Sequence, residues 1–442
     1  MNKTFLIKGD RISCLAEEKL FTLSNVPALK PEPYVWDIDD YRSLVTFELR
    51  HTKFPYEVIR NYTSTWANID KKLLEHSDYG GNTKKNGLFK DEIVAQEQNI
   101  ENARQILNIV KSKVKWDEKD KFFPDDNLKN PLKNAIGSSA DINFLYINAL
   151  KAGGFEAYPV MLSTRNNGRM PIANPSITAF NYTLTAVKID TAMCYVDASA
   201  KYGDINILPE KCMVDQARIL DPAGAYWVDL SKISSGTTFV LADLAFKENG
   251  LDGTIKVERN GNAGYDFRES YFGKHKNKEE YVEKLGTNIG YQINDFTIEG
   301  DQSPAEKVKV AFDVHKEATL EDDFLYVNPL VYKIYNENPF KSEHRIYPVQ
   351  FDYLDSFIEM VNITIPEGYA VEELPQSERF IFGDNRAIVF TYALNNVGNK
   401  IAVNYQLQVR TIMVLPSEYE HLKEFFAKVV AKNNEQIVLK KI

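Results

Sequence analysis

The pattern of apolar residues changes near residue 238, and this change constrains the fold more than any single motif. Before it, apolar residues recur every three or four positions over residues 56–77 and 89–113, which predicts amphipathic helices. After it, short apolar runs such as "FIEMVNITIP" and "KIAVNYQLQVRTIMVL" dominate and are typical of strands. We therefore expect an α+β core over residues 41–237, followed over residues 238–442 by a mostly antiparallel, sandwich-like β domain with a terminal helix.

The first 40 residues form a third segment. Residues 4–30 are interpreted as two strands, and two strands alone are marginally stable in water. We expect this segment to pack on a later domain or to be the tail of an upstream β domain. A connector with Pro27, Pro31 and Pro33 follows, and its aromatic residues indicate that it is docked. The N-terminus has no cleavage-like site and is not interpreted as a signal peptide. Whether the chain is a fragment of an exported precursor stays open.

Composition excludes several classes of function. The net charge is −9, and the acidic excess is spread along the chain, so nucleic acid is not expected as a partner. No run approaches the roughly 18 apolar residues that a membrane span requires. The three cysteines, Cys14, Cys194 and Cys212, form no CxxC pair, which excludes a disulfide framework and a zinc cluster. No metal or cofactor is predicted.

A candidate site begins at the turn Ile136-Gly137-Ser138-Ser139, which leads into a helix from about Asp141 to Ala152. Thiol proteases and transferases place a cysteine at such a helix N-terminus, with a histidine and an orienting acid supplied by other segments. In this chain Ser139 holds that place. The later strands "FNYTLTAVKID" and "AMCYVDASA" would supply the partner and the acid.

These segments resemble the bacterial transglutaminase-like proteins of the papain-like superfamily. The resemblance is carried by "GSSADINFLYINALKAGGFEAYPVMLSTRNNG", "FNYTLTAVKID" and "YVDASAKYGDINILPEKC", and it is strongest with the large envelope forms that have flanking β domains. It covers about residues 20–230 and is weaker after 240. It implies a papain-like core and a periplasmic or envelope location. By the resemblance, the family's cysteine falls on Ser139, its histidine on Tyr182 after Asn181, and its aspartate on Asp197.

Two of these three catalytic positions depart from the family pattern. A serine hydroxyl needs a strong base, and the phenol of Tyr182 titrates near pH 10. No histidine lies between residues 77 and 274. Cys194 and Cys212 are interpreted as buried structural residues. Ser138 with Asp141 forms an S-x-x-D pattern, so helix capping explains the turn without catalysis.

Three hypotheses about function follow. The first is a catalytically inactive transglutaminase-like protein that serves as a binding or scaffold module in the cell envelope. Its ligand would be a peptide, a glycan or a partner protein, with Asn181, Arg165 and Arg169 as possible contacts in the cleft. The second is an active serine- or cysteine-based hydrolase or acyltransferase, for which Lys151 or Arg165 could pair with Ser139. The third is a structural spacer whose cleft is filled by side chains. We favour the first.

Overall fold

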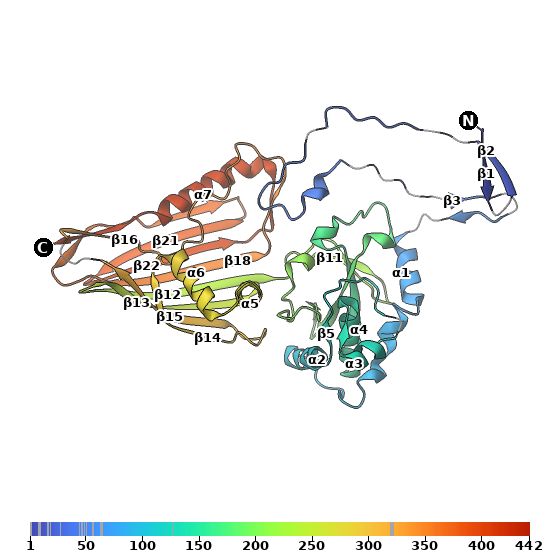
Figure 1. Cartoon of the computed structure of the whole chain (residues 1–442), viewed down its shortest axis with the longest axis horizontal. Helices are drawn as coiled ribbons and strands as arrows, with labels where there is room; N and C mark the ends of the chain where they lie inside the picture. The colour runs from blue at the N-terminus through green and yellow to red at the C-terminus, as the bar shows by residue number, and fades with distance from the viewer. Residues whose placement is uncertain are drawn as a thin grey trace.

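The computed structural model describes the chain except residues 1, 8–9, 16, 18, 27, 44, 46, 48, 50, 55–56, 62–64, 126 and 319–321, and it describes residues 2–7 and 10–15 by their backbone. An α+β core and a large β domain lie side by side, and the N-terminal segment extends beyond the core (Figure 1). The expected fold class is confirmed: the protein is α+β, mostly antiparallel, and β-rich in its C-terminal part.

Residues 2–61 contain two small antiparallel strand pairs and a docked connector. Of the two strands expected over residues 4–30, the second ends at Leu15, and the described residues between 17 and 30 form no strand. Strands β1 (Asn2–Ile7) and β2 (Asp10–Leu15) pair antiparallel, as do β3 (His51–Thr52) and β4 (Arg60–Asn61). Between them, the Trp36 indole N–H donates to the backbone oxygen of Phe351 at 3.1 Å, and the Trp36 backbone N–H donates to Gln350 Oε1 at 3.0 Å. The connector is thus held on the C-terminal domain.

The α+β core packs four helices around a five-stranded antiparallel sheet. The sheet order is β11-β10-β7-β8-β9, and a short parallel pair, β5 with β6, lies beside it. The helices are α1 (Trp66–Glu75), α2 (Ile100–Lys113), α3 (Lys129–Asn134) and α4 (Ser139–Ala152). The strands are β5 (Lys115–Trp116), β6 (Ile136–Gly137), β7 (Ala157–Leu162), β8 (Tyr182–Ile189), β9 (Ala192–Val196), β10 (Ala217–Ile219) and β11 (Tyr226–Val228).

Helix α4 is the central element of this core. Every residue from Ser139 to Leu150 is buried, because the helix is apolar on all sides and is enclosed by the sheet, by α2 and by the loops before α2. Helices α1 and α2 are shorter than the predicted ranges. Their starts are set by N-caps: the Thr65 side chain accepts from the Asn68 N–H, and the Asn99 side chain accepts from the Asn102 N–H.

The C-terminal domain is built on one eight-stranded sheet with the order β14-β15-β13-β12-β18-β22-β21-β20. All neighbours are antiparallel except β12 and β18, which are parallel. The strands are β12 (Ser235–Lys247), β13 (Gly250–Gly261), β14 (Gln292–Glu299), β15 (Val308–Glu317), β18 (Leu354–Thr364), β20 (Glu378–Phe382), β21 (Ile388–Val397) and β22 (Lys400–Val409). The change of pattern near residue 238 therefore falls within the first four residues of β12.

One face of this sheet forms the core of the domain. Its inward residues, including Val240, Val257 and Val403, are buried in one apolar cluster that also contains Leu422 and Phe426 of helix α7. The facing layer is made of helices, loops and a three-stranded sheet, β16-β24-β19, and not of a second large sheet (Figure 1). The covering elements are α5 (Asn262–Gly273), α6 (Lys278–Ile289), α7 (Tyr419–Asn433), β16 (Phe324–Val327), β17 (Val349–Gln350), β19 (Tyr369–Glu373), β23 (Met413–Val414) and β24 (Ile437–Lys441). Within the described residues, no helix combines the length and the apolar character needed to cross a membrane.

Candidate functional site

Ser139 is the first residue of α4, and its hydroxyl holds a neighbouring loop. Ser139 Oγ accepts from the Lys121 N–H at 2.9 Å and lies 3.5 Å from the Lys121 carbonyl oxygen, to which it donates. Ser138 caps the helix, because its Oγ accepts from the Asp141 N–H while Asp141 Oδ2 accepts from the Ser138 N–H at 2.8 Å. The predicted capping box is confirmed. Among the described residues, no cysteine or histidine bonds to Ser139.

Tyr182 and Asp197 are joined directly. Tyr182 begins β8, and Asp197 follows β9, the next strand of the sheet. The Tyr182 hydroxyl donates to Asp197 Oδ2 at 2.8 Å and lies 3.0 Å from Ser199 Oγ. Asp197 Oδ1 accepts from the backbone N–H of Ser199 at 3.0 Å and from its hydroxyl at 2.6 Å. The tyrosine therefore takes the orienting acid as its own hydrogen-bond partner.

Asn143 connects the helix to this pair. One turn after Ser139, its side-chain Nδ2 donates both to the Ser139 carbonyl oxygen at 3.0 Å and to Asp197 Oδ1 at 3.0 Å. Its Oδ1 accepts from the Ala198 N–H at 3.0 Å and from the Thr185 hydroxyl at 3.1 Å. Ser139, Tyr182 and Asp197 thus belong to one hydrogen-bonded cluster. Asn143 was not singled out from the sequence, although a polar residue four positions after Ser139 in an apolar helix is a usable signal.

The electrostatics of the cluster oppose proton transfer. Burial, and then the neighbouring Asp197, raise the pKa of the Tyr182 phenol well above its usual value. Cys212 Sγ lies 4.0 Å from Asp197 Oδ2, and burial with this carboxylate raises the pKa of the thiol in the same way. Cys194 is buried on β9, and burial raises its thiol pKa too. Neither thiol has the thiolate character of a nucleophile.

The cluster is closed to solvent. Ser139 and Tyr182 are 0% exposed and Asp197 is 1% exposed. On one side, Lys211 Nζ lies 4.7 Å from the centre of the Tyr182 ring, and it is held by an ion pair to Asp120 at 2.7 Å. On another side, helix α5 of the β domain approaches, and Asn262 donates from Nδ2 to the Leu208 carbonyl oxygen at 2.9 Å. Ser139, Tyr182 and Asp197 are therefore buried within the protein and do not line an open cleft.

Arg165 joins the two domains. Its guanidinium donates to Asp352 Oδ1 at 3.1 Å and to the Asp352 carbonyl oxygen at 2.8 Å, both in the β domain. Within the core it donates to the Met213 carbonyl oxygen at 3.0 Å, and it lies 3.4 Å from Glu210. Its guanidinium carbon is 3.9 Å from the centre of the Trp36 ring. The side chain is buried among these partners, and we therefore regard Arg165 as an interdomain clamp.

Asn181 and Arg169 also have partners in the protein. Asn181 Oδ1 accepts from the Thr164 N–H at 2.9 Å, and its Nδ2 donates to the Thr164 hydroxyl at 2.8 Å. Arg169 donates its backbone N–H to Asp40 at 2.7 Å, and its half-exposed guanidinium is 3.7 Å from Asp215. The three expected cleft contacts therefore gather around the loop after β7, where each of them is bonded to other residues of the protein.

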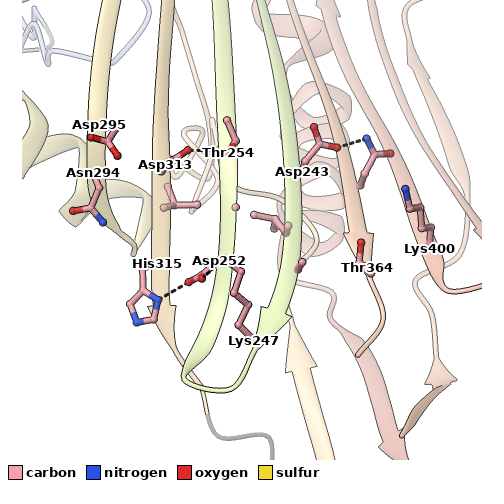
Figure 2. A pocket seen from close by; sticks show the side chains of 15 residues that line it. Asp243, Lys247, Asp252, Thr254, Asn294, Asp295, Asp313, His315, Thr364 and Lys400 are labelled. Atoms are coloured by element: carbon pink, nitrogen blue, oxygen red, sulfur yellow. Dashed lines mark hydrogen bonds and ion pairs between the residues drawn. The ribbon is translucent and has the colours of Figure 1, made fainter. Parts of the chain in front are cut away.

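A large pocket lies elsewhere, on the uncovered face of the eight-stranded sheet. This trough of about 800 Å³ crosses β12, β13, β14, β15, β18 and the start of β22, and the side chains of Figure 2 point into it. Its four acidic residues are Asp243, Asp252, Asp295 and Asp313. This trough was not predicted from the sequence, because its residues come from six strands that are separated along the chain.

Most acids of the trough are already paired. His315 Nδ1 is 2.6 Å from Asp252 Oδ1, and hydrogen bonds from His315 and Lys247 lower the pKa of Asp252 (Figure 2). Asp313 accepts from the Thr254 hydroxyl at 3.0 Å, and Asp243 accepts from the Asn362 amide at 2.8 Å (Figure 2). In the part of the chain that the structure describes, no group of three or more His, Cys, Asp or Glu residues is arranged to hold a metal ion. We assign no chemistry to the trough.

A family model matches part of the C-terminal domain. Residues 323–439 match DUF3858, a family of domains of unknown function with a solved structure. A solved protein of Parabacteroides distasonis, described as a presumed protease, aligns with 85% of this chain at 12% identity and a TM-score of 0.49. The chain covers 57% of the length of that protein. No curated protein matches the chain.

Proposed function

We propose that the chain is a catalytically inactive transglutaminase-like protein that serves as a binding or scaffold module in the cell envelope, for a peptide, a glycan or a partner protein. One observation carries the proposal of inactivity. The position where the family holds its catalytic base is occupied by Tyr182, which is buried and donates its proton to Asp197 at 2.8 Å.

Proton chemistry supports this proposal. Acyl transfer requires a nucleophile that loses its proton by the transition state, and a general base contributes about 10²–10⁴-fold in rate. The N-terminus of α4 would stabilise a charge on Ser139 by only about 0.3–1 kcal/mol, which cannot replace that base. The Ser139 hydroxyl instead bonds to the backbone of Lys121. Tyr182 is a donor toward Asp197, so it cannot accept a proton from serine.

The burial of Ser139, Tyr182 and Asp197 bears on where a ligand would bind. Because Ser139, Tyr182 and Asp197 are at most 1% exposed, a ligand of this protein would have to contact other surfaces. The same burial favours a second candidate, in which the core is a structural spacer that carries the β domain. The two candidates differ in one respect: a spacer has no ligand, and a binding module has one on an outer surface.

The experiment that tests inactivity is turnover of amine-donor and small-ester substrates by the unmodified protein and by Ser139→Ala. We expect no turnover by either protein and no labelling of the site by a thiol-directed probe. Turnover that disappears in Ser139→Ala would instead establish a serine hydrolase. The double substitution Ser139→Cys with Tyr182→His restores the family's residue types and is expected to recover traces of activity at most. The envelope location rests on the family resemblance, and fractionation of the source cells tests it.

A further inference from the structure

Strand β20 is an open edge of the large sheet. Its five residues pair with β21 on one side, and no described strand lies on the other side. Alternate residues of an edge strand direct their backbone N–H and C=O groups away from the sheet, where another chain can pair with them. At the opposite edge, β14 is interrupted by a bulge between Asn294 and Thr297, a device that disturbs such pairing. Strand β20 is paired with β21 along all its residues without a bulge.

A groove of about 520 Å³ runs between β20 and helix α7. It is lined on the strand side by Phe380, Ile381 and Phe382, and on the helix side by Phe425, whose ring centre is 6.3 Å from that of Phe382. The Ile381 side chain is 48% exposed. Apolar lining beside a free strand edge is the arrangement that receives an extended peptide, since the backbone pairs with the edge and side chains enter the groove.

The groove is also acidic. Asp384, Glu418 and Glu424 line it, together with the single lysine Lys428 and with His421. Glu418 accepts from the Leu415 N–H at 3.4 Å, and within the described residues no lysine or arginine forms an ion pair with any of the three carboxylates. The trough of Figure 2 differs, because Asp252 there is paired with Lys247 and His315. Carboxylates without a cationic partner, beside an apolar floor, favour a ligand that carries positive charge.

We propose that this groove binds an extended, lysine- or arginine-containing peptide segment, which adds to the sheet as a further strand beside β20. Apolar side chains of the peptide would contact Phe380 and Phe425, and its cationic side chains would lie near Glu418 and Glu424. At about 3.3–3.4 Å per residue, the five residues of β20 match a peptide of similar length. The proposal rests on the binding role proposed above and names its partner class, and it does not depend on the chemistry of the core.

The test uses the full chain and a fluorescent heptapeptide in which lysine and valine alternate. We expect saturable binding by fluorescence anisotropy that weakens as salt is added. Glu424→Lys replaces an attraction by a repulsion and is expected to weaken binding roughly threefold to tenfold. Glu420→Lys is the matched control: it makes the same charge change on the same helix, at an exposed residue outside the groove, and should leave affinity unchanged. Thermal unfolding verifies that both variants are folded.

Backbone pairing is tested separately from charge. Bound peptide should slow hydrogen exchange of the amides in residues 378–382, and methylating alternate backbone nitrogens of the peptide should abolish binding. Binding that survives methylation, or that responds equally to Glu424→Lys and Glu420→Lys, would reject strand addition. A chain that dimerises through β20 and excludes the peptide would reject it as well. The turnover assay reports on the core alone, so absence of peptide binding without turnover would remove this proposal and leave the proposed inactivity in place.

Discussion

Glu359 is a buried carboxyl group whose titration should control the stability of the β domain. It lies on β18 between Phe357 and Val361 on the covered face of the sheet, and it is 0% exposed. Its Oε1 accepts from the backbone N–H groups of Val331 at 2.7 Å and Tyr332 at 2.9 Å. Its Oε2 has no hydrogen-bond partner among the described residues. Burial raises the pKa of Glu359 to about 8, against the lowering effect of the two backbone donors.

The sign and the size of the effect follow from linkage. The ordinary pKa is 4.5, so between pH 4.5 and about 8 the folded protein keeps a proton on Glu359 that the unfolded chain has lost. The free energy of unfolding therefore falls as pH rises through this window. At 1.36 kcal/mol per pKa unit, the loss reaches about 3 kcal/mol at pH 7 and about 5 kcal/mol above pH 8.

Glu359→Gln removes this titration while keeping the shape and the acceptor for the two backbone N–H groups. We expect the variant to match the parent near pH 4.5, to be more stable at pH 7, and to show the largest gain at pH 9. Urea unfolding at these pH values measures the free energy of unfolding of the variant and the parent. Far-UV circular dichroism follows both domains, and fluorescence chiefly follows the α+β core, where Trp66, Trp116 and Trp227 lie. Glu373→Gln, at an exposed position of β19, controls for the substitution itself.

Two results would refute the reasoning. If Glu359→Gln destabilises the β domain equally at every pH, the carboxyl group is held by contacts that its amide cannot make. If the stability difference between variant and parent shrinks as pH rises, the carboxylate is the preferred form in the folded protein, and the direction of the pKa shift is wrong.

Three further predictions concern the core and its junction. Tyr182→Phe removes the donor to Asp197 Oδ2 and should lower the free energy of unfolding of the core by about 1–3 kcal/mol, measured by urea unfolding with tryptophan fluorescence. Arg165→Ala removes charged hydrogen bonds to Asp352, which typically contribute about 1.5–3 kcal/mol each. Because these bonds join the two domains, the variant should have a larger radius of gyration in small-angle scattering. Arg169→Ala, which removes a half-exposed guanidinium, should leave the radius of gyration unchanged. Lys111 is half-buried, and desolvation of its ammonium group lowers its pKa from 10.5 to about 8. Between these pH values the unfolded chain binds a proton that the folded protein has lost, so the free energy of unfolding should rise with pH by about 3 kcal/mol, and Lys111→Met should flatten this slope in thermal unfolding.

Local signals predicted the main elements of the fold. The change of pattern near residue 238 marks β12, which begins at Ser235, and the turn before Asp141 marks the start of α4 at Ser139. The predicted helix over residues 56–77 was too long, because the prediction used only the spacing of apolar residues. The side chain of Thr65 caps α1, so the helix begins at Trp66. Periodicity reports which face of an element is apolar, but a polar cap decides where the helix begins.

Long-range pairing could not be predicted in this way. Arg165 finds Asp352 at a separation of 187 residues, and no periodic pattern connects the two positions. The resemblance to a known family predicted Ser139, Tyr182 and Asp197 as a site, but it could not predict that helix α5 of the other domain contacts the core, where Asn262 donates to the Leu208 carbonyl oxygen. Sequence patterns within one segment carry no information about which distant element covers it.

The role of Asp197 follows from counting its donors. An ionised carboxylate offers about four acceptor positions. Asn143 from α4, Tyr182 from β8 and the backbone and hydroxyl of Ser199 fill them, at 2.6–3.0 Å. A catalytic acid orients one histidine and leaves that histidine free to exchange a proton on its other nitrogen. Here the acid instead joins a helix, a strand and a loop, and Tyr182 has no second proton to exchange. Ser139→Cys with Tyr182→His would therefore place a cysteine and a histidine beside a carboxylate that already serves as a buried anchor.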